Sequence, residues 1–178
     1  FQEFGEVVDV ELEDMHEMTA ARSERVAGAN GVVEVAEAPR GNCGIVAVVN
    51  ADGIAGLFRE LGATIVDGGE TLNPSTEELI AAIEAAPEPE IVLLPNSSNV
   101  ILAAERAVEL AGKEAVVVPT SSQQAGLAAA VALNPASNAE LNGSSMSSAL
   151  AVVRTGGVAP AARDDAEGRF GKGDAVGF

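Results

Sequence analysis

The sequence predicts an α/β fold, a parallel sheet with helices on both faces, built from about four βα units. From Gly44 onward, short runs rich in Val and Ile alternate with segments whose apolar residues recur at helical spacing. The apolar runs are continuous, as in strands that are buried on both faces. Right-handed crossovers between such strands place all the βα turns along one edge of the sheet.

Four apolar runs are the expected strands of this sheet. They cover residues 44–49, 64–66, 90–95 and 114–119. A further short strand is predicted over 158–163, and the chain stops at Phe178 inside another strand-like run. A local strand is also predicted near residues 32–35, within an otherwise irregular stretch.

The helices are predicted from apolar spacing and from end signals. Ile54, Leu57, Phe58 and Leu61 share one helical face, and Gly62 suits the position just beyond the helix. A capping box from Ser75 to Glu78 starts the next helix, over 77–86. The remaining helices are expected over 100–110, 125–133 and 146–153.

The chain divides into three parts by composition. Residues 1–18 contain an alternating, strand-like run at 8–13, residues 19–43 lose all periodicity and are typical of a linker, and residues 44–178 form the α/β domain. Because the chain starts without Met and stops within a strand-like run, we expect a piece of a longer protein, with the α/β domain truncated at its end.

Charge and composition exclude several classes of function. There are 27 acidic residues against 10 basic ones, a net charge of -17, which repels nucleic-acid phosphates and anionic membrane surfaces. No apolar run approaches the ~20 residues of a membrane-spanning helix, so no membrane insertion is expected. A single cysteine, Cys43, fits the reducing cytoplasm. The acid excess serves solubility, or speeds the encounter with a basic partner.

Polar residues gather where the predicted strands end, and this edge is the candidate site for a ligand or partner. Its members are amides, hydroxyls, glycines and two carboxylates: Asn50, Asp52, Asp67, Gly68, Gly69, Thr71, Asn73, Ser75, Thr76, Asn96, Ser98, Asn99, Thr120 and Ser121. Helix N-termini on this edge favour anions. The alternative is that the same residues serve as helix caps, for which Ser, Asn and Asp are preferred.

The sequence offers no recognisable catalytic constellation. It has no phosphate-binding loop of the Gly-x-x-x-x-Gly-Lys type, and Gly68-Gly69 is more typical of a tight turn. His16 is the only histidine, with no companions to form a zinc site, and Cys43 has no histidine beside it. The adjacent Asp164 and Asp165 are interpreted as a surface charge pair. We therefore predict no catalytic residue and no metal ligand in this chain.

Several motifs, in order, resemble the C-terminal domain of the DhaL-containing component of fatty acid kinase, a family of dihydroxyacetone-kinase-like proteins. The most specific is the string Gly68-Gly69-Glu70-Thr71-Leu72-Asn73-Pro74-Ser75-Thr76. The other matching segments are 44–49, 93–99, 103–105, 116–120 and 126–129. The loop 120–124 departs from the family's more apolar turn, which leaves its contacts open.

The resemblance implies a DegV-like fold and a protein of three parts. An N-terminal kinase domain would bind ATP and magnesium, a middle domain would follow, with residues 1–18 as its remnant, and the C-terminal domain would dock a DegV-like fatty-acid-binding subunit. The complex would make acyl phosphate, for phospholipid metabolism. On this basis the chain needs no cofactor of its own, since ATP and magnesium belong to the full-length protein.

Two other functions stay open. One is a small-molecule kinase or phosphatase, acting on a dihydroxyacetone (glycerone)-like substrate, with its own site at the strand-end edge; Asp52 and Asp67 are the carboxylates placed for it. The other is a dimerisation module, in which Ala-rich helices pack as a homodimer.

Overall fold

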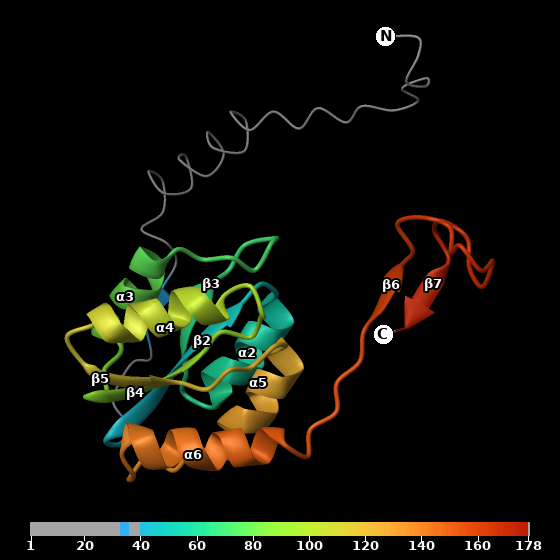
Figure 1. The fold of residues 1–178 in the computed structure, drawn as a ribbon. Helices are drawn as coiled ribbons and strands as arrows, with labels where there is room; N and C mark the ends of the chain where they lie inside the picture. The colour runs from blue at the N-terminus through green and yellow to red at the C-terminus, as the bar shows by residue number, and fades with distance from the viewer. Residues whose placement is uncertain (1–32, 36–39, 178) are drawn as a thin grey trace, which may run out of the picture. The chain divides into compact units, whose positions relative to one another are not determined.

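The structure is a computed structural model, which describes residues 33–35 and 40–177 of the chain. The strand expected at 8–13, His16, and most of the 19–43 segment lie outside the described residues. The central sheet has five strands in the order β1-β3-β2-β4-β5 (Figure 1). Their bounds are Val33–Glu34 for β1, Cys43–Val49 for β2, Thr64–Asp67 for β3, Glu90–Leu94 for β4 and Glu114–Val117 for β5.

The sheet is parallel except at one edge. β2 pairs in parallel with β3 and β4, and β4 with β5, which confirms the four predicted strands. The exception is β1, which runs antiparallel to β3 with Val33 opposite Val66. Arg59 donates a hydrogen bond to the Glu34 carboxylate. This bond connects β1 to the helix α2 (Asp52–Glu60), which contains Arg59. This short strand covers backbone groups of β3 that an open edge would leave unpaired.

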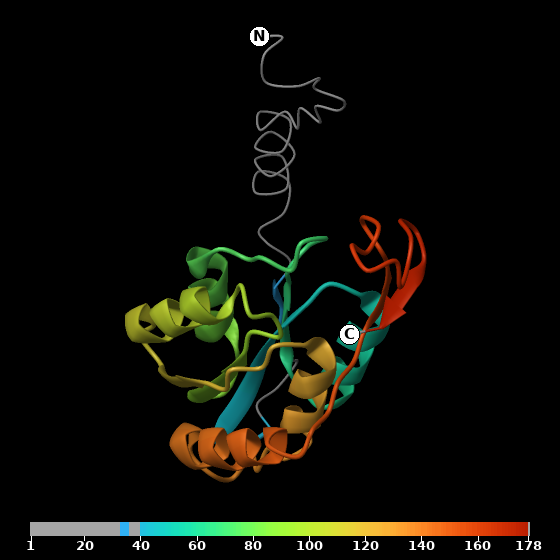
Figure 2. The same cartoon turned by 45° about the vertical axis from the view of Figure 1, so that its right-hand side comes forward.

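Five helices of the described part cover the two faces of the sheet (Figure 2). They are α2 (Asp52–Glu60), α3 (Thr76–Ala85), α4 (Ile101–Leu110), α5 (Gln123–Ala130) and α6 (Ala139–Leu150). The last one corrects the sequence prediction of 146–153. It begins earlier because Asn138 caps it, with its side chain accepting from Leu141 N at 2.9 Å. An Asn followed by Ala and Glu is a weaker start signal than the capping box of α3, which is present as predicted.

The core has two halves, one on each face of the sheet. Val46 and Val48 of β2 pack with α3 and α4, whereas Ile45, Ala47 and Val49 pack with α2, α5 and α6. This alternation follows from the two-residue period of a strand. Phe58 and Met146 are fully buried in the second half, where they fill space that the many alanines leave.

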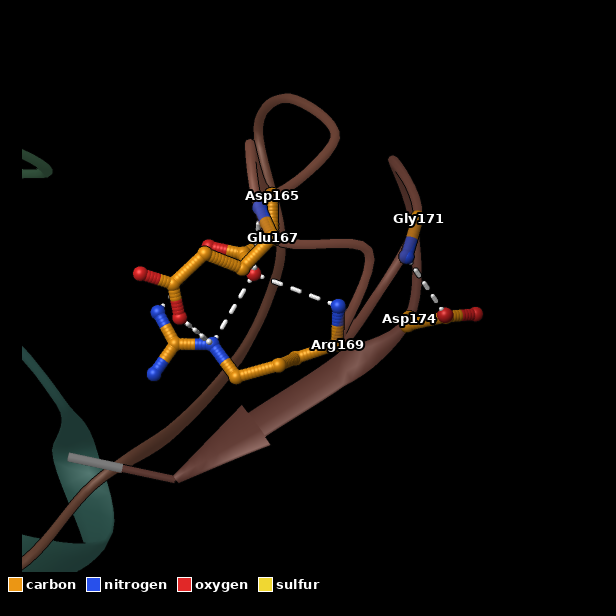
Figure 3. A network of polar contacts seen from close by, with 5 residues as sticks. All are labelled: Asp165, Glu167, Arg169, Gly171 and Asp174. Atoms are coloured by element: carbon orange, nitrogen blue, oxygen red, sulfur yellow. Dashed lines mark hydrogen bonds and ion pairs between the residues drawn. The ribbon is translucent and has the colours of Figure 1, made fainter.

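Near the carboxyl end of the chain, two short strands form a separate antiparallel pair. They are β6 (Val158–Pro160) and β7 (Ala175–Gly177), so the predicted strand at 158–163 is shorter than expected. Figure 3 shows the loop between them, in which Asp165 accepts from the Arg169 side chain at 2.9 Å. This contact lowers the pKa of Asp165 and raises that of Arg169. Asp165 therefore forms an ion pair with Arg169.

The Glu90 carboxylate, at the amino end of β4, connects this strand to two other segments of the chain. Glu90 accepts from Ala139 N at 2.6 Å and from the Asn42 side chain at 2.7 Å, which joins β4 to the first turn of α6. Both hydrogen bonds lower the pKa of Glu90, and the one from Ala139 has the larger effect.

In the described ranges, no helix has the length and apolarity required to span a bilayer.

Candidate functional site

The sheet order creates a switch point between β2 and β4. The chain leaves β2 toward β3 on one side and returns to β4 on the other, so that β2 is flanked by both. In open α/β sheets, the crevice outside the carboxyl ends of two such strands is the usual binding place. Asn50 follows β2 and Asn96 follows β4, so two of the predicted edge residues lie at this point.

Asn96 and Thr120 are buried and bonded to each other at the switch point. Asn96 N donates to Thr120 Oγ1 at 3.0 Å, and Thr120 Oγ1 donates to Asn96 Oδ1 at 2.8 Å. The side-chain Nδ2 of Asn96 also donates to the Val48 carbonyl at 2.9 Å. Asn96 has a φ of 57°, a left-handed conformation that Asn adopts more readily than most residues. These side chains fasten the ends of β2 and β4 to the segment that follows β5.

Asn50 is joined to the start of α5. Its Oδ1 accepts from the Gln123 side chain at 2.7 Å, and its backbone N–H donates to Gln123 Oε1 at 3.3 Å. Gln123 lies in the loop whose contacts the sequence left open. Its pairing with Asn50 ties that loop to the end of β2.

The segment from Asp67 to Thr76 forms a compact loop after β3. Asp67 accepts from Gly69 N at 2.8 Å, and Gly69 has a φ of 63°. A Cβ at Gly68 would lie 2.8 Å from Leu72 Cδ1 and 3.1 Å from Val48 Cγ1, so the loop packs closely at this position. Ser75 caps α3: its Oγ accepts from Glu78 N, while Glu78 accepts from Ser75 N at 2.7 Å. Within the ranges 33–35 and 40–177, no hydrogen bond joins this loop to Asn50, Asn96 or Thr120.

The remaining predicted residues stay at the surface of the edge. These are Asp52 in the first turn of α2, Thr71 and Asn73 in the loop after β3, Ser98 and Asn99 before α4, and Ser121 before α5. Asp52 and Asp67, the carboxylates considered for a metal or nucleotide, come from α2 and β3. No group of three or more His, Cys, Asp or Glu among the described residues is arranged to hold a metal ion.

A small hollow opens beside Ser121. Its volume is about 160 Å³, and its lining comes from the start of α5, the segment before it and the end of α6: Pro119, Thr120, Ser121, Ala125, Leu150, Val153 and Thr155. Sequence reasoning predicted Thr120 and Ser121 but missed the contribution of α6, which comes from a segment almost thirty residues further along the chain.

Sequence reasoning also missed Gly126. A Cβ at this position would lie 1.8 Å from Asn96 Oδ1, so α5 can approach the Asn96–Thr120 pair only with glycine there. A glycine inside an Ala-rich helix is the signal that could have found it, because glycine weakens a helix unless close packing requires it.

Cys43 lies at the opposite, amino-terminal end of β2 and is 1% exposed. Burial raises the pKa of its thiol to about 11, and nearby Glu90 and Glu88 contribute in the same direction. A neutral thiol is a poor nucleophile. Its interpretation as a buried core residue is consistent with this geometry.

Comparison with known proteins gives a family. Residues 44–178 match the FakA-like C-terminal family, the C-terminal domain of proteins like the A component of fatty acid kinase. Protein YloV of Bacillus subtilis is 36% identical over 99% of this chain, and an uncharacterized protein of Staphylococcus haemolyticus is 36% identical over 92% of it. An uncharacterized protein of Staphylococcus aureus is 32% identical over the same share.

The chain covers 32% of the length of YloV and 30% of the length of the Staphylococcus haemolyticus protein, about a third of these relatives. The family match spans most of the chain and includes the strand-end motifs around Gly68 and Asn96. The resemblance predicted from those motifs is thereby confirmed. This chain belongs to the FakA-like C-terminal family and is a fatty-acid-kinase-related α/β domain.

Proposed function

We propose that this chain is a docking domain of a fatty-acid-kinase-type phosphotransferase. In this role it holds an acyl-binding, DegV-like subunit in the cytoplasm while another part of the full-length protein performs phosphoryl transfer. Membership in the FakA-like C-terminal family supports the relation to fatty acid kinase. The length of the relatives, about three times that of the aligned region, leaves room for a separate kinase domain.

The geometry of the strand-end edge is the observation that carries the docking role. Its best-placed polar side chains are engaged with each other: Asn96 with Thr120, Asn50 with Gln123, and Ser75 with Glu78. Asn96 and Thr120 are buried, so their pairing holds the backbone of the edge in place rather than facing a partner. An edge that is held in this way binds a partner with little loss of conformational entropy. A ligand that used the same groups would first have to break those bonds.

Phosphoryl transfer needs a nucleotide cradle and magnesium ligands. We assign ATP and magnesium to the N-terminal kinase domain of the full-length protein. One of the two carboxylates considered for a metal, Asp67, already accepts a hydrogen bond from the backbone of Gly69. The acyl carboxylate that becomes phosphorylated would be presented by the docked subunit.

Calorimetry on the 178-residue chain tests the proposal. Titration with an acyl-loaded DegV-like fatty-acid-binding protein from the same organism is expected to give saturable binding at micromolar concentration or below. Titration with ATP and magnesium under the same conditions is expected to give no heat of binding. Nucleotide binding without binding of the acyl protein would favour the small-molecule kinase instead.

Sedimentation of the chain by itself addresses the dimerisation module. A monomer that forms a one-to-one complex with the acyl-binding protein supports docking. A stable homodimer that does not bind the acyl-binding protein would contradict it.

A further inference from the structure

The β6–β7 hairpin contributes nothing to the hydrophobic core. Every residue from 158 to 177 is exposed or half-buried, and Val158 is 76% exposed. Among the described residues, neither half of the core extends beyond Leu150. A two-stranded hairpin without a core is marginally stable in water. Contacts within the hairpin therefore have to supply its order.

Polar contacts inside the hairpin hold its long loop in one shape. Asp165 accepts from the backbone N–H groups of Glu167 and Arg169, both at 3.2 Å, and from the Arg169 side chain (Figure 3). Asp174 accepts from Gly171 N at 2.8 Å. Within the described ranges, every hydrogen bond and ion pair of residues 158–177 joins two members of that segment. The hairpin is thus a unit with internal contacts of its own.

The segment that connects α6 to the hairpin is weakly attached. Residues 154–157, with the sequence Arg-Thr-Gly-Gly, have no regular structure. In the described part of the chain, residues 154–156 take part in no backbone hydrogen bond. Their side chains form one hydrogen bond, from Ser122 Oγ to Thr155 Oγ1 at 3.5 Å, a length at which such bonds are weak.

The two glycines of this segment are not required by the shape that the chain adopts. Gly62 and Gly69 have a positive φ, which disfavours other residues, but Gly156 and Gly157 do not. What glycine adds at such positions is access to further backbone conformations. Hinges are built from a few loop residues that absorb large changes in φ and ψ. We propose that residues 154–157 are a hinge, about which the β6–β7 hairpin moves as a rigid unit, independently of the α/β body (residues 40–153).

The base of this hinge lies at the candidate edge of the sheet. Val153 and Thr155 line the hollow together with Thr120 and Ser121. Ser122, which donates to Thr155, is also the N-cap of α5. Movement of the hairpin that carries Thr155 away from Ser122 opens the hollow. By the reciprocity of linked equilibria, a molecule that covers Thr155 restricts the hairpin.

The test measures distance distributions between two spin labels on cysteines introduced into the 178-residue chain. Cys43 is 1% exposed, so it is not labelled in the folded protein. The hinge pair, Glu105→Cys with Ala159→Cys, joins exposed positions of α4 and β6. The control pair, Glu105→Cys with Leu141→Cys, joins α4 to an exposed position of α6. Circular dichroism checks that all variants fold.

We expect the distribution of the hinge pair to be at least about twice as wide as that of the control pair, because only the first pair spans the hinge. Adding Gly156→Ala together with Gly157→Ala is expected to narrow it, since alanine restricts the backbone. Equal widths for the two pairs would show that the hairpin is fixed on the body and would overturn the proposal. A width that the two alanines leave unchanged would overturn it as well, because the pivot would then lie elsewhere.

Trypsin gives a second, independent readout on the unlabelled chain. Proteases cut segments that open locally, whereas a helix resists them. We expect cleavage after Arg154 to be at least about tenfold faster than cleavage after Arg106, whose side chain is 61% exposed on α4. Mass spectrometry identifies the fragments. Cleavage at the same rate after both arginines would mean that residues 154–157 are as firmly held as a helix, which contradicts a hinge.

Discussion

Thr120 Oγ1 bridges the backbone and the side chain of Asn96, accepting from its N–H at 3.0 Å and donating to its Oδ1 at 2.8 Å. Both residues are 1% exposed. The bridge joins the carboxyl ends of two neighbouring strands to the start of α5, where the candidate edge is built. It also means that the hydroxyl which the sequence offered as a ligand group is already occupied within the fold.

Thr120→Val tests the bridge. Valine has the shape of threonine but no hydroxyl, so Asn96 would keep a buried N–H and a buried oxygen without partners. Leaving such groups unsatisfied costs about 1–3 kcal/mol each, and we expect a loss of about 2 kcal/mol or more in the free energy of unfolding, measured with urea. Ser98→Ala, at an exposed position of the same edge, should change it by less than about 0.5 kcal/mol. Equal stability of the two variants would show that the bridge contributes little.

Gly126→Ala tests how closely α5 approaches Asn96. The new methyl group would lie 1.8 Å from Asn96 Oδ1, so either the helix or the side chain must move. Overpacking of this kind costs about 1–3 kcal/mol. Gly56→Ala in α2, where a Cβ meets nothing within 4 Å, is the matched substitution and is expected to stabilise by about 0.5–1 kcal/mol. Stabilisation by both substitutions would contradict the close approach.

Glu90→Gln should weaken the fold in a pH-dependent way. In the folded protein the pKa of the Glu90 carboxyl group is lowered from its ordinary value of about 4.5. The carboxylate therefore stabilises the fold above that ordinary value, and this contribution is lost as the pH falls through the folded-state pKa. At pH 7 we therefore expect Glu90→Gln to lower the melting temperature, and at pH 3 the difference between the two proteins should be smaller. Glu114→Gln, at the start of β5, serves as the comparison at both pH values. An equally large difference at pH 3 would mean that the charge of Glu90 is not the cause.

Cys43 should be unreactive in the folded protein. With its pKa raised to about 11, the thiolate fraction at pH 8 is on the order of 10⁻³, and burial also blocks the reagent. We expect iodoacetamide to label Cys43 slowly in buffer and rapidly in 6 M guanidinium chloride (about the concentration that unfolds most domains), followed by mass spectrometry. Labelling at the same rate in both solvents would show that the thiol is accessible.

The raised pKa of Cys43 also has a consequence for stability at high pH. The unfolded thiol ionises near its ordinary value of 9.0 and the folded one near 11, so the folded state retains a proton that the unfolded state loses. Stability that depends on this group is complete below pH 9 and falls as the pH rises toward 11. Urea unfolding at pH 8 and pH 10.5 should show a larger loss for the parent chain than for Cys43→Ala. The same loss in both proteins would assign it to other groups.

Local patterns in the sequence predicted most elements of this fold, although they placed α6 too late in the chain and made β6 too long. The continuous apolar run at Ile45 and its neighbours identified a strand buried on both faces, because no solvent-facing position interrupts it. The capping box at Ser75 identified the start of α3, because both of its hydrogen bonds lie within four residues. The motif around Gly68 likewise identified the family, as the match over residues 44–178 confirms.

Only the tertiary structure decided which polar groups of the edge are free and which are engaged. The partners of Asn50 and Asn96 are Gln123 and Thr120, which are distant in sequence, and no spacing rule relates them. The sequence also did not reveal that β1 pairs antiparallel with β3, or that Gly126 allows α5 to pack closely against Asn96. The same is true of the hollow that the end of α6 helps to line. Short-range hydrogen bonds and apolar periods are properties of neighbouring residues, whereas contacts between separate elements depend on how the strands are ordered in the sheet.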